Sequence, residues 1–113
     1  MSVPDRGDFV WLDFDPRAGH EQGGHRPAIV LSPKSYNAKT GMALCCPITS
    51  RPKGYAFEFL LPPGDRMVGA VLADHIRNID WKARRARKAG RASEEVVSGV
   101  LGKLGALLGM PSS

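Results

Sequence analysis

The sequence predicts a mainly β fold with one C-terminal helix, an α+β arrangement built on a small, strongly curved antiparallel sheet or open barrel. The first two-thirds of the chain consists of short apolar runs separated by turn residues, which is typical of strands. The end of the chain has the apolar spacing of an amphipathic helix. The length of 113 residues suits one domain, so we expect a single domain over 1–113.

The first predicted strand spans 8–14. Its apolar residues alternate between two faces, with Phe9 and Trp11 on one and Val10 and Leu12 on the other. An Asp-Pro pair follows directly, and the proline ends the strand because it cannot donate to a ladder and restricts the residue before it.

The remaining strands are shorter and are bounded by proline, glycine and asparagine. Residues 33–41 are expected to form a loop, with Asn37 and Gly41 as turn residues. Pro47 favours an edge position or a bulge in the third strand. Further strands are predicted at 27–32, 42–49, 57–61 and 68–72, with a continued or bent strand over 74–81 and a last short strand over 84–90.

A helix is predicted from Ser93 onward. Ser93 suits the N-cap, and Glu94 and Glu95 lie in the first turn, where the helix dipole favours negative charge. Gly109 suits the C-cap and Pro111 follows it. One apolar stripe that should pack on the sheet recurs at three- and four-residue steps: Val96, Val97, Val100, Leu101, Leu104, Leu107 and Leu108.

The composition is that of an ordinary globular protein with an excess of positive charge. A net charge of +5 and a pI near 9.6 fit a polyanionic partner, either nucleic acid or an acidic protein, and fit a solvated basic surface equally well. No apolar run approaches the roughly 20 residues of a membrane span, and no signal peptide pattern opens the chain. We therefore expect a cytoplasmic protein.

The two cysteines, Cys45 and Cys46, are adjacent, so an ordinary disulfide between them would need a strained ring. They lie in no metal-ligand spacing. A strand would point them to opposite faces, and we expect both to be small buried hydrophobic residues.

The loop over 17–26 concentrates residues that can perform chemistry. It holds two histidines, one glutamate, one glutamine and two arginines among three glycines. Glycines allow sharp turns and close approach to a ligand, and the backbone N–H groups beside Arg26 could hold a phosphate. From composition alone, a catalytic loop and an ordinary exposed hairpin loop both remain open. No nucleotide-binding, HExxH or serine-elbow motif is present.

Short motifs recur in a characteristic order along nearly the whole chain. They are GD at 7–8, WLDFDP at 11–16, GHEQGGHRPA at 19–28, VLS at 30–32, YN at 36–37, KTG at 39–41, PIT at 47–49, KGY at 53–55 and LAD at 72–74. Taken together, this set resembles the MazF/PemK toxin family, and the similarity runs from residue 7 to about 109. The chain has His20 where family members commonly have a serine, which bears on the local RNA contacts.

This resemblance implies a fold, an activity and partners. The fold is an SH3-like, strongly twisted antiparallel barrel of the PemK/CcdB type with a C-terminal helix. Members are toxins of toxin–antitoxin pairs that cut single-stranded RNA, including mRNA, at short sequences. They need no metal or other cofactor, leave 2′,3′-cyclic phosphate and 5′-hydroxyl ends, and stop translation and growth. They act as homodimers, and an acidic MazE-like antitoxin covers the RNA groove.

The resemblance also assigns three catalytic residues. Arg26 matches the catalytic arginine, whose planar donor fork suits two phosphate oxygens. Thr49 matches a threonine whose hydroxyl can donate to the same phosphate; a strand-end residue that satisfies the backbone is the alternative. Glu21 either accepts the 2′-hydroxyl proton or orients Arg26 as an ion pair.

Other residues are expected to bind RNA. His25 either assists as acid or base or lines the groove, and Phe14 either stacks on a base or packs in the core. The basic residues of 84–91 form either an electrostatic rim or a solvated face. The resemblance places near the RNA His20, Gln22, Lys53, Asp74 and His75, and together with Phe14 and His25 these are the candidate RNA-binding residues.

Two other functions are compatible with such a fold. One is a gyrase poison of the CcdB type, which shares the fold without the nuclease chemistry. That group relies on a C-terminal Trp-Gly-Ile, whereas this chain ends Gly-Met-Pro-Ser-Ser. The other is a catalytically silent module that binds RNA or the antitoxin.

Overall fold

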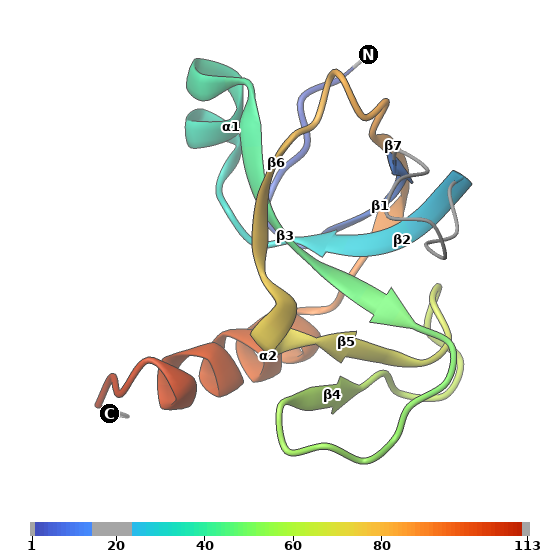
Figure 1. The fold of residues 1–113 in the computed structure, drawn as a ribbon, viewed down its shortest axis with the longest axis vertical. Coiled ribbons are helices and arrows are strands. Elements are labelled where there is room, and N and C mark those ends of the chain that lie inside the picture. The colour runs from blue at the N-terminus through green and yellow to red at the C-terminus, as the bar shows by residue number, and fades with distance from the viewer. Residues whose placement is uncertain (1, 15–23, 112–113) are drawn as a thin grey trace.

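The computed structural model describes residues 2–14 and 24–111, and these form a seven-stranded antiparallel sheet with two α-helices (Figure 1). The strand order is β4-β5-β3-β2-β1-β7, and β6 pairs with β3 beside this path. The sheet is not closed, so the barrel expected from the sequence is an open one. The elements are β1 Asp8–Phe14, β2 Gly24–Val30, α1 Lys34–Thr40, β3 Met42–Thr49, β4 Glu58–Leu60, β5 Ala70–Leu72, the 3₁₀ turn η1 Ala73–His75, β6 Arg77–Asp80, β7 Arg87–Arg91 and α2 Glu94–Leu107.

Strand β3 is the centre of the sheet. One side of it pairs with β2, while on the other side β6 pairs with its first half and β5 with its last residues. The edge position predicted from Pro47 is therefore wrong. Pro47 instead lies where the partner changes from β6, whose pairing ends at Cys45, to β5, whose pairing begins at Ile48. A residue without an N–H fits there because neither β6 nor β5 pairs with it on that side of β3, while on the other side it pairs with Ala28 of β2.

The two faces of β3 contribute to two apolar clusters. Cys46 is buried with Phe9 and Ile29, and Cys45 is buried with Val10 and Val30. Both thiols are free. The expectation of two small buried residues on opposite faces of a strand is confirmed.

Helix α1 occupies the segment that the sequence analysis interpreted as a loop, so that prediction is wrong. Asn37 lies inside the helix and is completely buried. Its side-chain amide donates to the carbonyl oxygens of Pro4 and Ser32, and its backbone carbonyl oxygen accepts the indole N–H of Trp81 at 2.9 Å. These contacts come from distant parts of the chain and stabilise a short helix that has no apolar stripe of its own.

Helix α2 begins as predicted. The Ser93 side chain caps it by accepting the N–H of Val96 at 3.2 Å. At the other end Gly109 has a left-handed φ of 75°, and its N–H bonds to Ala106 while the next N–H bonds to the carbonyl of Gly105. This pair of bonds is a Schellman motif, so the glycine follows the C-cap by one residue.

Only part of the predicted stripe of α2 is buried. Val96, Val100 and Leu104 pack into the cluster around Phe9. Leu101, Leu107 and Leu108 are exposed, which corrects the prediction that they pack on the sheet. Figure 1 shows α2 passing the β4–β5 end of the sheet, with its last turn beyond the strands.

Strand boundaries differ elsewhere by a few residues. β2 begins at Gly24 rather than at residue 27 and ends at Val30. The segment 74–81 is a 3₁₀ turn followed by β6, which agrees with a bend, and the predicted strand over 84–90 is β7, shifted toward its end. Among the described residues, no helix is long and apolar enough to cross a membrane.

Candidate active site

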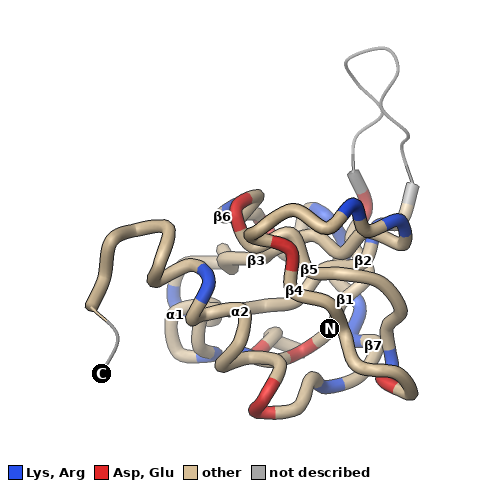
Figure 2. Tube along the Cα trace, turned by 90° about the horizontal axis from the view of Figure 1, so that it is seen from below, with Lys and Arg blue, Asp and Glu red and all other residues tan. Residues whose placement is uncertain are grey.

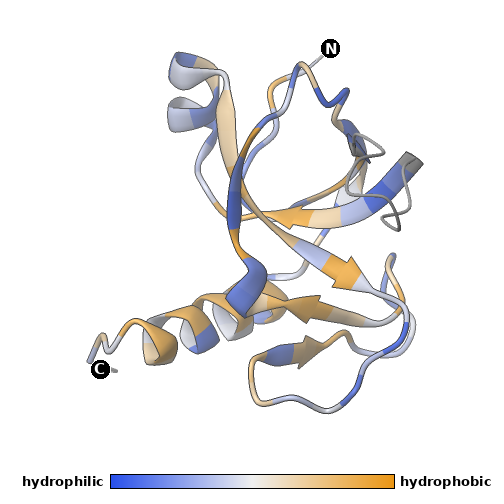
Figure 3. Cartoon of the chain, viewed as in Figure 1, coloured by the Kyte–Doolittle hydropathy of each residue, from blue (hydrophilic) through white to orange (hydrophobic). Residues whose placement is uncertain are grey.

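A groove of about 1010 Å³ runs past the ends of β2 and β3. The end of β2 that reaches it is hydrophilic, whereas the inner part of the strand is apolar (Figure 3). The groove thus joins a rigid sheet to a polar surface, an arrangement typical of functional sites. It is lined by Trp11, His25, Arg26, Pro27, Pro47, Ile48, Thr49, Ser50, Arg51, Arg66, Met67, Val68 and Leu72.

Two of the three predicted catalytic residues, Arg26 and Thr49, border this groove from neighbouring strands. The antiparallel register pairs Ala28 of β2 with Pro47 of β3. Continued by two residues, the same register sets Arg26 opposite Thr49. Residues opposite each other point to the same face. Arg26 is exposed, so its guanidinium is accessible to a ligand in the groove.

The Thr49 hydroxyl has a backbone partner. Its Oγ1 accepts the N–H of Arg51 at 3.1 Å, which supports the chain as it leaves β3. A hydroxyl carries one donor hydrogen and two acceptor lone pairs. Accepting from Arg51 therefore leaves its hydrogen available to a phosphate oxygen, so this backbone contact is compatible with the catalytic role predicted for Thr49.

His25 is held by a carboxylate. Its Nδ1 lies 3.2 Å from Oδ1 of Asp13, and the two residues are register partners in β1 and β2. The guanidinium of Arg85 approaches the other oxygen of Asp13 at 3.8 Å. Because consecutive strand residues point to opposite faces, His25 and Arg26 enter the groove from different sides of β2.

A glycine fixes the loop between β4 and β5 against this site. Gly69 has φ +121° and lies so close to Thr49 that a Cβ on the glycine would overlap the threonine carbonyl oxygen. The residues just before it, Arg66, Met67 and Val68, form one wall of the groove. Only a residue without a side chain permits this approach.

Several residues that line the groove are not predicted as site residues by the sequence. They are Trp11, Ser50, Arg51, Arg66, Met67 and Val68. The alternation in β1 predicts the strand face of Trp11, but it does not predict which loop lies beside that face. The others lie in connections between strands, where hydropathy has no periodic pattern. The one local sign of this groove wall in the sequence is Gly69, whose contact with Thr49 requires a glycine.

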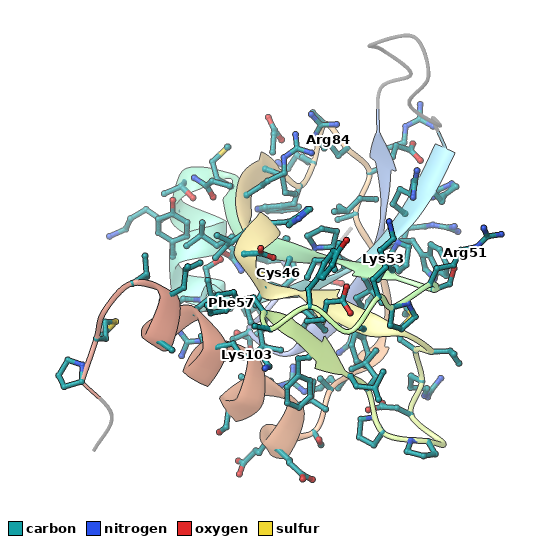
Figure 4. All side chains as sticks on the ribbon, turned by 60° about the horizontal axis from the view of Figure 1, so that its bottom comes forward. Cys46, Arg51, Lys53, Phe57, Arg84 and Lys103 are labelled. Carbon is teal, nitrogen blue, oxygen red and sulfur yellow. The ribbon has the colours of Figure 1, made fainter. Side chains whose placement is uncertain are left out.

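Three predicted RNA-binding residues, Lys53, Asp74 and His75, are not among those that line the groove. Lys53 lies in the connection between β3 and β4, as does Arg51. Figure 4 shows both residues, and the side chain of Arg51 extends away from the fold. The Glu58 carboxylate accepts the N–H groups of Lys53 at 3.0 Å and Gly54 at 2.9 Å and so fixes this connection.

Asp74 and His75 belong to the 3₁₀ turn and are both exposed. His75 Nε2 lies 3.8 Å from Oδ1 of Asp74. The role predicted for these two residues and for Lys53 stays a prediction.

Four further predictions fall beyond the described parts of the chain. Glu21, His20 and Gln22 lie outside the described residues. Phe14 ends β1, and its side chain is likewise outside the description.

Charge does not by itself single out the groove. Lys and Arg residues occur on many elements of the fold (Figure 2). Within residues 2–14 and 24–111, no three His, Cys, Asp or Glu side chains are grouped so that they could hold a metal ion. What distinguishes the groove is the combination of a guanidinium, a hydroxyl and a carboxylate-bound imidazole that line it.

Comparison with known proteins identifies relatives of the whole chain. The endoribonuclease toxin MazF of Escherichia coli K12 is 50% identical over 107 residues, covering 95% of this chain and 96% of the relative. The endoribonuclease toxin ChpB of the same organism is 41% identical over 110 residues, covering 92% and 93% of the two chains.

Solved structures agree with these relatives. A crystal structure of MazE–MazF from Deinococcus radiodurans matches with a TM-score of 0.91 and 56% identity, covering 98% of this chain and all of that one. The sequence pattern of PemK-like, MazF-like toxins of type II toxin–antitoxin systems matches residues 5–108. The chain therefore belongs to the PemK-like, MazF-like toxin family.

Proposed function

We propose that this chain is the toxin of a toxin–antitoxin pair and an endoribonuclease that cuts single-stranded RNA in the groove beside β2 and β3. The observation that carries the proposal is that Arg26 and Thr49 border one groove from adjacent strands. The relatives named as endoribonucleases span the same length of chain, which supports the same activity here.

The reaction uses the RNA's own 2′-hydroxyl. The 2′-oxygen attacks the adjacent phosphorus while its proton passes to a base, and the bond from phosphorus to the 5′-oxygen breaks. The leaving oxygen takes a proton, so the products are a 2′,3′-cyclic phosphate and a 5′-hydroxyl. This chemistry requires a proton acceptor, a proton donor and positive charge at the pentavalent phosphate.

Arg26 and Thr49 supply the stabilisation of that phosphate. Arginine keeps its positive charge at neutral pH and presents parallel donors, which suits charge stabilisation better than proton transfer. Thr49 adds a hydroxyl donor from the neighbouring strand. Glu21 either accepts the 2′-hydroxyl proton or holds Arg26 in place as an ion pair.

The partners follow from charge. A chain with a net charge of +5 attracts both RNA and an acidic antitoxin segment, and the two compete for the same groove. The Deinococcus relative has been solved as MazE–MazF, which supports a MazE-like partner. Because mRNA is the target, the protein acts in the bacterial cytoplasm, where cleavage stops translation and growth.

The active form is a homodimer, and an apolar hollow of about 400 Å³ offers the contact face. Leu31, Tyr36, Leu44, Ile76 and Leu101 line it, and three of these are exposed large hydrophobic residues: Tyr36, Leu44 and Leu101. Such a patch on a small protein is typical of an interface. Sedimentation velocity should show Leu101→Glu as a monomer, while Leu107→Glu, which is exposed outside the hollow, stays dimeric. A dimeric Leu101→Glu would rule out this face.

The test of the activity is incubation of the purified protein with a long single-stranded RNA in EDTA, beside Arg26→Ala. Cuts at one short sequence with cyclic phosphate ends, lost in the variant, are the expected result. Circular dichroism should show both proteins folded, because Arg26 is exposed. RNA binding without cleavage over varied sequences would indicate a silent binding module, and absence of both would call for a gyrase assay.

A further inference from the structure

Arg66 is a cationic residue of the groove to which the proposed reaction gives no role. It lies in the connection between β4 and β5, and its exposed side chain lines the groove together with Met67 and Val68. The wall that carries it is fixed at one end by Gly69 against Thr49.

The stem of Arg66 is fixed as well. A Cβ built on Gly90 would lie 3.0 Å from Cγ of Arg66 and 3.4 Å from its Cβ, so the arginine packs its methylenes directly over the glycine of β7. Gly90 has φ +145° and no side chain to prevent this contact. An arginine whose stem is already ordered loses less conformational entropy when its guanidinium binds a ligand.

The guanidinium of Arg66 has no carboxylate partner among the described residues. Two other arginines of the fold do have a carboxylate partner: Arg91 lies 2.8 Å from Asp8, and Arg85 lies 3.8 Å from Asp13. The one bond to a neighbouring acid at this position comes from the backbone, since the Arg66 N–H donates to Asp65. A guanidinium on a packed stem, with no ion pair among the described residues and facing a groove, is suited to bind an anion.

The register separates this cation from Arg26. Gly90 pairs with Phe9 of β1, so Arg66 packs on the face of the sheet to which Phe9 points. Arg26 pairs with Leu12, which points to the opposite face. The two arginine side chains therefore start from opposite faces of the sheet, which suits them to contact different phosphates.

We propose that Arg66 binds the phosphate of a nucleotide that flanks the scissile one and so sets how the RNA lies in the groove. This inference rests on the proposed ribonuclease function. Arg66 acts on substrate binding, whereas Arg26 and Thr49 act on the transition state. A contact made equally in the ground state and the transition state changes KM and leaves kcat unchanged.

The first experiment is steady-state cleavage of a short RNA that contains one cut site, with folding checked by circular dichroism. Arg66→Ala should raise KM about 10-fold or more with kcat within about 2-fold, as expected for a lost charge-assisted contact to phosphate. Arg66→Lys should recover part of the loss because lysine keeps the charge. Lys39→Ala, which removes one charge from α1 outside the groove, should match the wild type.

The second experiment identifies the phosphate. A set of RNAs carries one neutral methylphosphonate linkage at each position around the cut site. One of these linkages should weaken the wild type about as much as Arg66→Ala does, and should have no further effect on the variant. The salt slope of log Kd should also fall by about 0.7 in Arg66→Ala, the value for one phosphate on a single strand.

These outcomes separate the inference from the function beneath it. If the wild type cuts no RNA, the proposed function fails. If the wild type cuts RNA and Arg66→Ala shows an unchanged KM, or every methylphosphonate weakens the variant and the wild type alike, the function stands and the role of Arg66 is overturned. A selective fall in kcat would make Arg66 part of the chemistry and would also overturn it.

Discussion

Gly69 lies directly against the backbone of Thr49, and no side chain could occupy the space between them. A Cβ on Gly69 would overlap the carbonyl oxygen of Thr49 and come within 3.1 Å of the Cα of Ser50. Thr49 and Ala70 are also register partners across β3 and β5. The close approach of Gly69 therefore helps to hold the backbone of the threonine beside the groove.

We expect Gly69→Ala to damage both stability and activity. The new methyl group would overlap backbone, and its φ of +121° is unfavourable for any residue with a side chain. Together these effects should cost about 3 kcal/mol or more in the free energy of unfolding and should reduce RNA cleavage. Chemical denaturation and the cleavage assay measure the two losses.

Gly64→Ala is the matched control for this substitution. Gly64 also has a left-handed φ, of +84°, but a Cβ there would meet no atom within 4 Å. This control should cost about 1 kcal/mol and leave cleavage intact. Equal losses in the two variants would mean that backbone strain alone, and not the contact with Thr49, matters at residue 69.

Thr49→Val should slow cleavage while RNA binding persists. Valine has nearly the shape of threonine but lacks the hydroxyl that we assign to the phosphate, so kcat should fall about 100-fold, as for a lost transition-state donor. The Arg51 N–H also loses its acceptor, but it lies in an exposed segment where water can replace it. Single-turnover cleavage and a binding assay with a 2′-deoxy analogue separate the two steps. A rate near that of the wild type would remove Thr49 from the mechanism.

The sheet and the terminal helix were accessible from the sequence because each has a strong local signal. Alternating apolar residues mark β1, and Ser93 with two glutamates marks the start of α2. The short helix α1 was not accessible, since Asn37 is a turn residue by propensity. Its burial against Pro4, Ser32 and Trp81 joins segments that no local pattern connects.

The site shows the same division between local and long-range signals. The match to the family motifs predicts that Arg26 and Thr49 act together, and the structure has them on β2 and β3 beside one groove. Arg66 enters the groove only because Gly69 and Gly90 allow its connection and its stem to pack closely. Such packing depends on residues far apart in the sequence, so composition and spacing could not reveal it.

The two buried thiols should make the protein less stable in alkali. Burial raises the pKa of Cys45 and of Cys46 from 9.0 to about 12, with the neighbouring Cys46 adding to the effect on Cys45 and the charge of Asp74 adding to the effect on Cys46. At a pH between 9 and 12, the thiols of the unfolded chain have lost their protons, whereas those of the folded chain keep them. The free energy of unfolding should therefore be unaffected below about pH 9 and should fall as the pH rises toward 12, by about 1.4 kcal/mol per pH unit for each thiol.

The control for this alkaline effect removes the thiols. Urea unfolding at pH 8 and pH 10 should show a smaller difference in C45A/C46A than in the wild type, because other titrating groups are shared by both proteins. An identical pH dependence in the two proteins would show that the thiols ionise as readily in the folded chain as in the unfolded one.

Leu104 should be the most sensitive leucine of α2. Its side chain is 7% exposed and packs with Val100 in the cluster around Phe9, whereas Leu108 is 70% exposed. Leu104→Ala leaves a cavity in that cluster and should cost about 2–5 kcal/mol in the free energy of unfolding. Leu108→Ala removes the same atoms from solvent-exposed surface and should change stability by less than about 0.5 kcal/mol. Urea denaturation of both variants at one protein concentration measures the difference, and equal small losses would show that α2 contributes little to the core.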